Sequence, residues 1–199
     1  MNIITTEFPD VKIIEPDIYR DDRGYFFETF NLGKFTEVIG GFEIKQANQS
    51  KSKCGVIRGL HFQKPPYTQA KIVEVIKGEV LDIIVDIRTD SSMFGKYYSI
   101  ILSGTNKKLL YIPRGFAHGF ITLTKDAIFQ YYVDNNYSPK YEGGIVYNDS
   151  NLNIDWIRKY KIIVSDKDKQ LKQFNEQIFF TKVEYYENIN DIELPIIKM

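Results

Sequence analysis

In Leu81-Asp82-Ile83-Ile84-Val85-Asp86-Ile87, every odd-numbered side chain is apolar. Asp82, Ile84 and Asp86 share the opposite face, because successive side chains of a β-strand alternate between the two faces of a sheet. The stretch therefore predicts a β-strand with one wholly apolar face.

Further short runs rich in β-formers lie around this strand, and turn residues separate them. The runs are Ile72–Ile76, Tyr97–Leu102, Leu109–Ile112, Gly119–Leu123 and Ala127–Val133. Strands that recur at a spacing of roughly 8–12 residues are typical of an all-β sandwich or barrel, and they argue against alternating βαβ units.

Helices are expected in only two places. One short helix can form between Phe30 and Ile39. A second is predicted from about Asp166 to Gln173, because Ser165 is a good N-cap and acidic residues follow it. The stretch 174–199 is mixed, and an edge strand, a cover over the barrel and a frayed end all remain open for it.

Composition restricts the class of protein. The chain has 199 residues, of which 43% are apolar and 15% aromatic, so we expect one folded domain over 1–199. Lys+Arg and Asp+Glu both number 26, which argues against a general binder of nucleic acid or membrane surfaces. The single Cys54 excludes an internal disulfide and a cysteine-built zinc site. With no signal peptide or apolar span visible, we expect a cytoplasmic protein.

The chain has two histidines, and each lies near an arginine and glycines. His61 stands in Arg58-Gly59-Leu60-His61-Phe62-Gln63, and His118 in Pro113-Arg114-Gly115-Phe116-Ala117-His118-Gly119-Phe120. Histidine is the side chain that exchanges protons most readily near neutral pH, so the pattern indicates proton transfer on an anionic substrate. A barrel metal site usually needs about three imidazoles and a carboxylate, so we predict no metal, with a metal-dependent barrel enzyme as the alternative.

A candidate anion-binding set consists of Arg23, Arg58 and Lys71, although solvated surface cations are the plainer interpretation of these residues alone. Arg58 and His61 are three residues apart, so in a regular strand they would point to opposite faces. Gly59 between them is compatible with a β-bulge, which would bring the two side chains to one face.

A series of short motifs then gives the sequence a specific resemblance. In chain order they are Asp22-Arg23-Gly24-Tyr25-Phe26-Phe27-Glu28, Gln46-Ala47-Asn48-Gln49-Ser50, the motif around His61, Gly78-Glu79-Val80, Val85-Asp86-Ile87-Arg88, the motif around His118 and Ser165-Asp166-Lys167-Asp168. From about Phe8 to Gln173, the chain resembles the dTDP-4-dehydrorhamnose 3,5-epimerase family.

The resemblance implies an all-β, cupin-like double-stranded β-helix (jelly roll) with a short C-terminal helical segment. It also implies a homodimer, in which the segment Arg23 to Glu28 is exchanged between subunits, and a reaction on a dTDP-linked 4-keto-6-deoxy sugar without a cofactor. On this basis His61 is the general base, Asp168 its partner and Tyr131 the general acid. The implied substrate-binding residues are Arg23, Phe26, Glu28, Gln46, Asn48, Arg58, Lys71, His118, Tyr137, Glu142 and Lys167, of which Tyr137 would stack on thymine.

Three residues near this set depart from the family's usual pattern: Ala47, Gln49 and Asn136. The alternatives are therefore an epimerase that acts at C3 only, one that acts on another 4-keto nucleotide sugar, a related ketoisomerase, and a non-catalytic barrel that binds nucleotide sugars. The presence of His61, Tyr131 and Asp168 together argues against the last of these.

Overall fold

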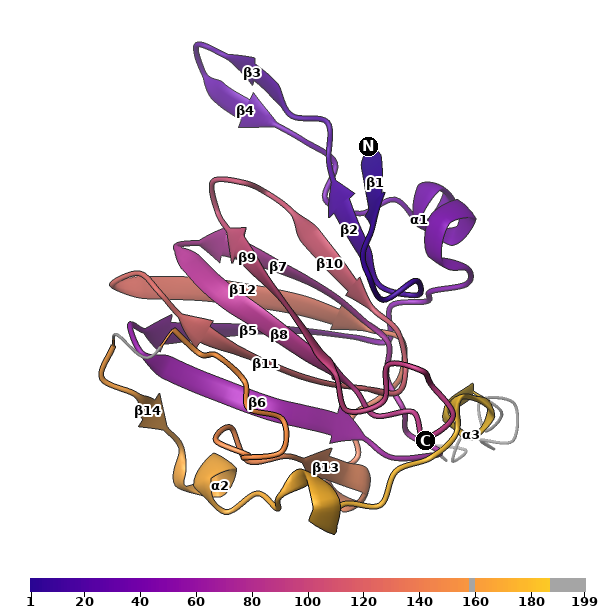
Figure 1. Cartoon of the computed structure of the whole chain (residues 1–199). Coiled ribbons are helices and arrows are strands. Elements are labelled where there is room, and N and C mark those ends of the chain that lie inside the picture. Colours follow the sequence, from indigo (N-terminus) through magenta and orange to yellow (C-terminus); the bar gives the residue numbers. More distant parts are fainter. Residues whose placement is uncertain (158–159, 187–199) are drawn as a thin grey trace, which may run out of the picture.

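The computed structural model describes residues 1–157 and 160–186, and it consists mainly of two facing β-sheets (Figure 1). The first sheet has the strand order β1 (Asn2–Thr5), β2 (Lys12–Glu15), β10 (Leu109–Ile112), β7 (Lys71–Lys77), β12 (Asp126–Val133) and β5 (Gln46–Lys53). The second has the order β13 (Glu142–Gly144), β6 (Val56–Gln63), β11 (Phe116–Thr122), β8 (Glu79–Asp86) and β9 (Tyr97–Ser103), with β14 (Ile163–Val164) parallel to β6.

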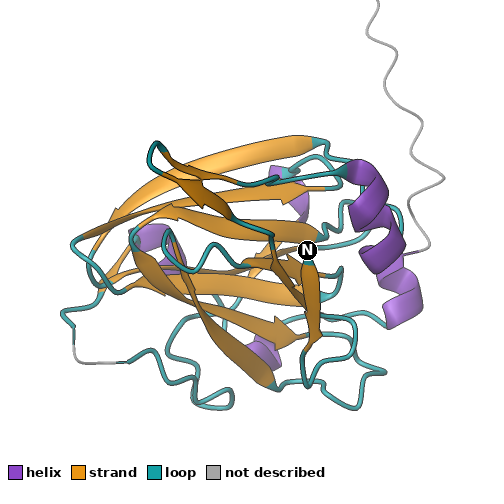
Figure 2. Ribbon diagram, turned by 90° about the horizontal axis from the view of Figure 1, so that it is seen from above, coloured by secondary structure: helices purple, strands orange, loops and turns teal. Residues whose placement is uncertain are grey.

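This arrangement is the jelly roll that the sequence predicted, and all six expected strands are present within three residues of their expected starts. Strands β5 and β6, which carry several of the predicted site residues, were not among the expected runs. Figure 2 shows that strands and loops make up most of the molecule. None of the helices in the described ranges is long and apolar enough to cross a membrane.

A short hairpin, which we call the arm, extends from the body of the molecule. It consists of β3 (Tyr19–Asp21) and β4 (Gly24–Phe26), paired with each other and with neither large sheet (Figure 1). Its exposed aromatic residues include Tyr19, Tyr25 and Phe26, which is 70% exposed.

Strand β8 shows how the core is divided. Its odd-numbered residues Leu81, Ile83 and Val85 pack on the outer side of the second sheet, whereas Val80 and Ile84 pack between the two sheets. The predicted alternation is therefore confirmed. Both faces are buried, because the chain after β13 covers the outer side and the first sheet faces the inner one. Asp82 and Asp86 share the inner face and are removed from solvent there.

The first sheet is covered on its outer side by the N-terminal helix α1 (Leu32–Ile39). The expected helix is confirmed, with its start shifted two residues to the position after Asn31, whose side chain accepts a hydrogen bond from the Lys34 N–H. Phe35 and Phe42 pack against Ile72 of β7 in this outer cluster.

The second predicted helix is shorter than expected. Ser165 is the N-cap as predicted, but α2 covers only Asp166–Lys169. The prediction that it reaches Gln173 is wrong, because Lys172 forms a β-bridge with Ile145 and accepts a hydrogen bond from the Val146 N–H.

Residues 174–186 cover the outer side of the second sheet. They contain the 3₁₀ turn η2 (Phe174–Glu176) and helix α3 (Lys182–Tyr186), and they bury Phe174 and Tyr185 in the outer cluster. A further 3₁₀ turn, η1 (Pro139–Tyr141), leads into β13. Of the three arrangements considered for 174–199, a cover is found as far as residue 186, and 187–199 lie outside the described residues.

Candidate active site

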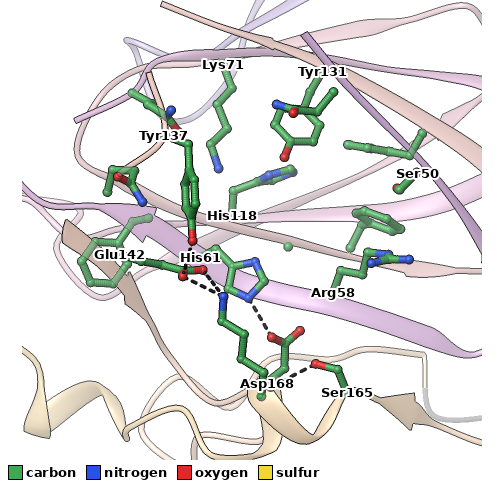
Figure 3. A pocket seen from close by; sticks show the side chains of 18 of the residues that line it. Ser50, Arg58, His61, Lys71, His118, Tyr131, Tyr137, Glu142, Ser165 and Asp168 are labelled. Carbon is green, nitrogen blue, oxygen red and sulfur yellow. Dashed lines mark hydrogen bonds and ion pairs between the residues drawn. The ribbon is translucent and has the colours of Figure 1, made fainter. Parts of the chain in front are cut away.

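A cavity of about 480 Å³ lies between the two sheets (Figure 3). Lys71 and Tyr131 project into it from the first sheet, and His61 projects from the second. Ten of the predicted site residues line it: Asn48, Arg58, His61, Lys71, His118, Tyr131, Tyr137, Glu142, Lys167 and Asp168.

The irregularity expected at Gly59 is present, and it explains how Arg58 and His61 come together. In the pairing of β6 with β11, His61 faces His118 but Arg58 faces Phe120, so the strands shift by one residue between them. Gly59 has φ +121°, and a Cβ there would lie 2.6 Å from the Cα of Gly119. The close approach of the two strands therefore requires glycine.

His61 forms a pair with Asp168. Its Nε2 lies 2.9 Å from Oδ1 of Asp168, which is nearly buried, whereas the His61 side chain is 33% exposed. An ionised carboxylate accepts only, so Nε2 carries the proton and Nδ1 is the nitrogen able to accept one. The pair therefore has the form of a general base held in one tautomer by a carboxylate.

The local chain keeps Asp168 ionised. Burial alone would raise the pKa of this carboxyl group, but the hydrogen bond from His61, the charge of that ring and the N–H of Gly59 together bring the pKa below its ordinary value. Oδ2 accepts that Gly59 N–H at 3.2 Å, and the Asp168 N–H donates to Oγ of the N-cap Ser165 at 3.1 Å. The register shift at Gly59 and the start of α2 thus hold the same carboxylate.

Lys71 lies opposite the pair, and its side chain is nearly buried. Its ammonium group makes no hydrogen bond or ion pair with the rest of the described chain. Burial lowers the pKa of Lys71 to about 8, with Asp82 and Glu142 opposing the shift. A cation in this position can stabilise negative charge that develops on a ligand.

Tyr131 stands on the wall opposite His61, with its ring centroid 6.0 Å from Nζ of Lys71. Burial raises the pKa of its phenol, so the hydroxyl stays protonated at neutral pH. No hydrogen bond from this hydroxyl to another described residue is present. Tyr131 is therefore free to donate a proton to a bound molecule.

At the cavity mouth, Glu142 binds two neighbours. Nζ of Lys167 lies 2.7 Å from both carboxylate oxygens, and the hydroxyl of Tyr137 donates to Oε2 at 2.8 Å. Gln46 is next to this group, because its Oε1 accepts the N–H of Tyr137 at 3.2 Å. Gln46 itself does not line the cavity.

The arm residues Arg23, Phe26 and Glu28 are not brought to the cavity of their own chain. Arg23 binds Asp21 of the same hairpin, and Glu28 binds Lys34 of α1. Within one subunit, these three predicted substrate-binding residues and the ten that line the cavity therefore form separate groups.

Sequence reasoning missed several residues of the site. Gln63 and Gln69 line the cavity. Asp82 lies behind it, and its carboxylate accepts a hydrogen bond from Nε2 of His118. The sequence offered one signal that Asp82 has a functional role, because it is a charged residue in the middle of a largely apolar strand.

The donor atoms for a metal are few. Each histidine is engaged by its own aspartate, and no group of three or more His, Cys, Asp or Glu side chains suited to a metal ion occurs within residues 1–157 and 160–186.

The chain is similar to known proteins over most of its length. Residues 5–176 match the family model described as dTDP-4-dehydrorhamnose 3,5-epimerase. The enzyme of that name from Shigella flexneri is 46% identical over 181 residues, which cover 90% of this chain and 99% of the relative.

Two crystal structures are similar along almost their whole length. A dTDP-6-deoxy-D-glucose-3,5-epimerase from Legionella pneumophila in complex with dTDP-4-keto-L-rhamnose has a TM-score of 0.87 and 43% identity, with 90% of this chain and 97% of that one covered. A 3′-monoepimerase from Streptomyces bikiniensis in complex with dTDP-quinovose has a TM-score of 0.86 but 27% identity, with 92% and 95% covered.

Proposed function

The chain belongs to the dTDP-4-dehydrorhamnose 3,5-epimerase family, and we propose that it inverts C3 and C5 of dTDP-4-dehydro-6-deoxy-glucose to give dTDP-4-dehydro-L-rhamnose. One observation carries the proposed mechanism. The His61–Asp168 pair faces the protonated phenol of Tyr131 across a cavity that also contains the unpaired ammonium group of Lys71.

The first step is removal of a proton next to the C4 ketone. Nδ1 of His61 takes this proton, and the carboxylate of Asp168 stabilises the imidazolium that results. The electrons of the broken C–H bond move to the ketone oxygen and form an enolate. Lys71 stabilises that oxygen, because its cation has no hydrogen-bond or ion-pair partner among residues 1–157 and 160–186.

The second step is return of a proton from the other side of the sugar ring. Tyr131 comes from the first sheet and His61 from the second, so the acid and the base lie on opposite walls. Protonation by Tyr131 therefore inverts the carbon centre. Both C3 and C5 flank the ketone, so the same base and acid can deprotonate and reprotonate each carbon in turn.

The nucleotide part is assigned to the remaining residues. Arg58 and Lys167 supply positive charge for the diphosphate, and arginine can bind phosphate oxygens in a bidentate manner. Tyr137, 45% exposed at the mouth, presents an aromatic ring for stacking on thymine. Asn48 and His118 are assigned to the sugar. Gln46 supports Tyr137, because its side-chain Oε1 accepts the backbone N–H of Tyr137.

The arm residues Arg23, Phe26 and Glu28 suit a homodimer in which each arm reaches the cavity of the partner. An exposed aromatic hairpin outside both sheets is a hazard for a free monomer, and pairing with a second subunit would remove that hazard. A dimer would also bring the two separate groups of predicted binding residues together.

An epimerase acting only at C3 is the main alternative. The fold does not distinguish the two activities, since the TM-scores to a double and a single epimerase are 0.87 and 0.86. Sequence identity favours double inversion, because it is 43% to the former and 27% to the latter.

We further propose a cytoplasmic, metal-independent enzyme with one domain over 1–199.

The decisive experiment follows isotope uptake. The protein is incubated in D2O with dTDP-4-dehydro-6-deoxy-glucose, and deuterium at C3 and C5 is measured by NMR together with the configuration of each centre. We expect uptake and inversion at both carbons. Uptake at C3 alone would support the single epimerase, and no uptake with retained binding would support a non-catalytic barrel.

A further inference from the structure

Asp82 is a buried charge for which the mechanism above has no role. It lies in the middle of β8 and is completely shielded from solvent. Its two carboxylate oxygens lie 2.9 and 3.1 Å from Nε2 of His118. A buried carboxylate is costly unless it is paired, so its place in the charge balance of the cavity requires an explanation.

The direction of the side chains places Asp82 and Lys71 in the same interior. Even-numbered residues of β8, such as Val80 and Ile84, pack between the sheets, and Asp82 shares their face. Val73 and Val75 of β7 pack in the same layer, and Lys71 shares their face. Asp82 and Lys71 therefore approach the cavity from opposite sheets, with the ring of His118 on the same side as Asp82.

Three carboxylates of the described chain lie in the cavity wall or behind it, and of these only Glu142 pairs with a lysine. Glu142 is held by Lys167, and Asp168 is held by His61. The cavity is also lined by the phenol of Tyr131, whose ring centroid lies 6.0 Å from Nζ of Lys71, and by the guanidinium of Arg58, which donates to Ser52. The carboxylate of Asp82 has His118 as its sole hydrogen-bonding partner within the described chain.

His118 does not neutralise Asp82. Burial lowers the pKa of the His118 ring, and the charges of Lys71 and His61 act in the same direction, against the opposing effect of Asp82. The ring is therefore neutral near pH 7, and the Asp82–His118 pair retains one negative charge. Asp82 is also first among the charges that raise the pKa of Lys71 against the effect of burial.

We propose that Asp82 is a positioning residue, which supplies the negative charge that keeps Lys71 protonated and fixes His118 with its Nε2–H turned away from the substrate. The carboxylate acts through these two residues and does not line the cavity itself. The consequence for catalysis rests on the proposed function, because a protonated Lys71 is what stabilises the enolate oxygen.

The test measures the protonation of Lys71 directly. Protein with ¹³C-labelled lysine is titrated by NMR, and the Cε signal of Lys71 is identified with Lys71→Arg. In Asp82→Asn the hydrogen bond to His118 can still form, but the charge is lost. We expect the midpoint for Lys71 to fall by about one pH unit or more, the usual effect of removing an opposite charge nearby. The midpoint should return towards the original value in Asp82→Glu.

Glu74→Gln is the matched control. Glu74 is another buried carboxylate, three residues from Lys71 on the same strand, but it points to the outer side of the first sheet, where Tyr132 donates to it at 3.3 Å. Removing its charge should leave the Lys71 midpoint unchanged. If Asp82→Asn does not fold, Asp82→Ser offers the same loss of charge with a smaller side chain.

Kinetics supply the second measurement. In Asp82→Asn, the decline of kcat on the alkaline side should begin at lower pH than in the wild type. The loss of kcat relative to the wild type should therefore be smaller at acidic pH than at alkaline pH. A uniform loss of kcat at every pH, with an unchanged Lys71 midpoint, would overturn the proposal and leave Asp82 a structural residue. The NMR titration needs no turnover, so a shifted midpoint in a protein without epimerase activity would refute the proposed function and leave the role of Asp82 intact.

Discussion

Replacing Tyr131 by Phe should separate the two halves of the proposed reaction. The change removes one hydroxyl group from the wall opposite His61 and leaves the base, its carboxylate and Lys71 in place. Removal of the substrate proton should therefore continue. Delivery of a proton to the opposite face of the ring should fail.

The structure sets the size of both effects. The Tyr131 hydroxyl makes no hydrogen bond to the described residues, so the free energy of unfolding should change by less than the ~1 kcal/mol that such a bond usually contributes. The melting temperature should then move by less than about 2–4 °C. General acid catalysis typically contributes about 10²–10⁴-fold, and inversion should slow by that factor.

The assay compares isotope exchange with inversion in D2O. His61 is one-third exposed, so its ring can trade a substrate proton for deuterium and return it to the same face. In Tyr131→Phe we expect deuterium at C3 with far less inverted product, both followed by NMR. Equal and small losses of exchange and inversion would show that Tyr131 only packs on the strand, and the reasoning above would be refuted.

Four further outcomes are expected. His61→Asn should abolish deuterium uptake at C3 with the circular dichroism spectrum unchanged, and uptake at the wild-type rate would exclude His61 as the base. Protein treated with a chelator should keep full activity, because two histidines that each hold an aspartate are poor donors for a metal; loss of activity restored by a divalent ion would contradict this. Light scattering should give a mass of twice 23.3 kDa, whereas a lone monomer at micromolar concentration would argue against arm exchange. The pKa of Asp168 is lowered in the fold, so its stabilising effect is present above about pH 4 and lost below it; thermal melts of Asp168→Asn should therefore show a weaker loss of stability in acid than those of the wild type.

The strands of the barrel were predictable because their information is local. Alternating apolar residues and turn signals marked β8 and its neighbours, and Asn31 and Ser165 lie at the starts of the two expected helices. Strands β5 and β6 were not marked in this way. Polar residues such as Asn48 and Arg58 break the apolar pattern there, because one face of each of those strands lines the cavity.

The end of α2 shows a limit of local reasoning. Capping predicted where the helix begins, but its end at Lys169 depends on a bridge between Lys172 and Ile145, which are distant in sequence. The cover formed by residues 174–186 is likewise decided by contacts with the second sheet.

The sequence by itself determined the fold class, the family and ten of the residues that line the cavity, because periodicity and motifs are properties of the chain order. Tertiary structure alone decided which of those residues meet. The shift at Gly59 turns Arg58 to the same face as His61, and the start of α2 brings Asp168 to that ring across more than a hundred residues. Lys71 has no hydrogen-bond or ion-pair partner among the described residues, and Asp82 lies behind His118, because two facing sheets exclude water from both side chains. Charge interactions depend on distance and solvent and not on sequence position, so only the folded chain brings these groups to act on one another.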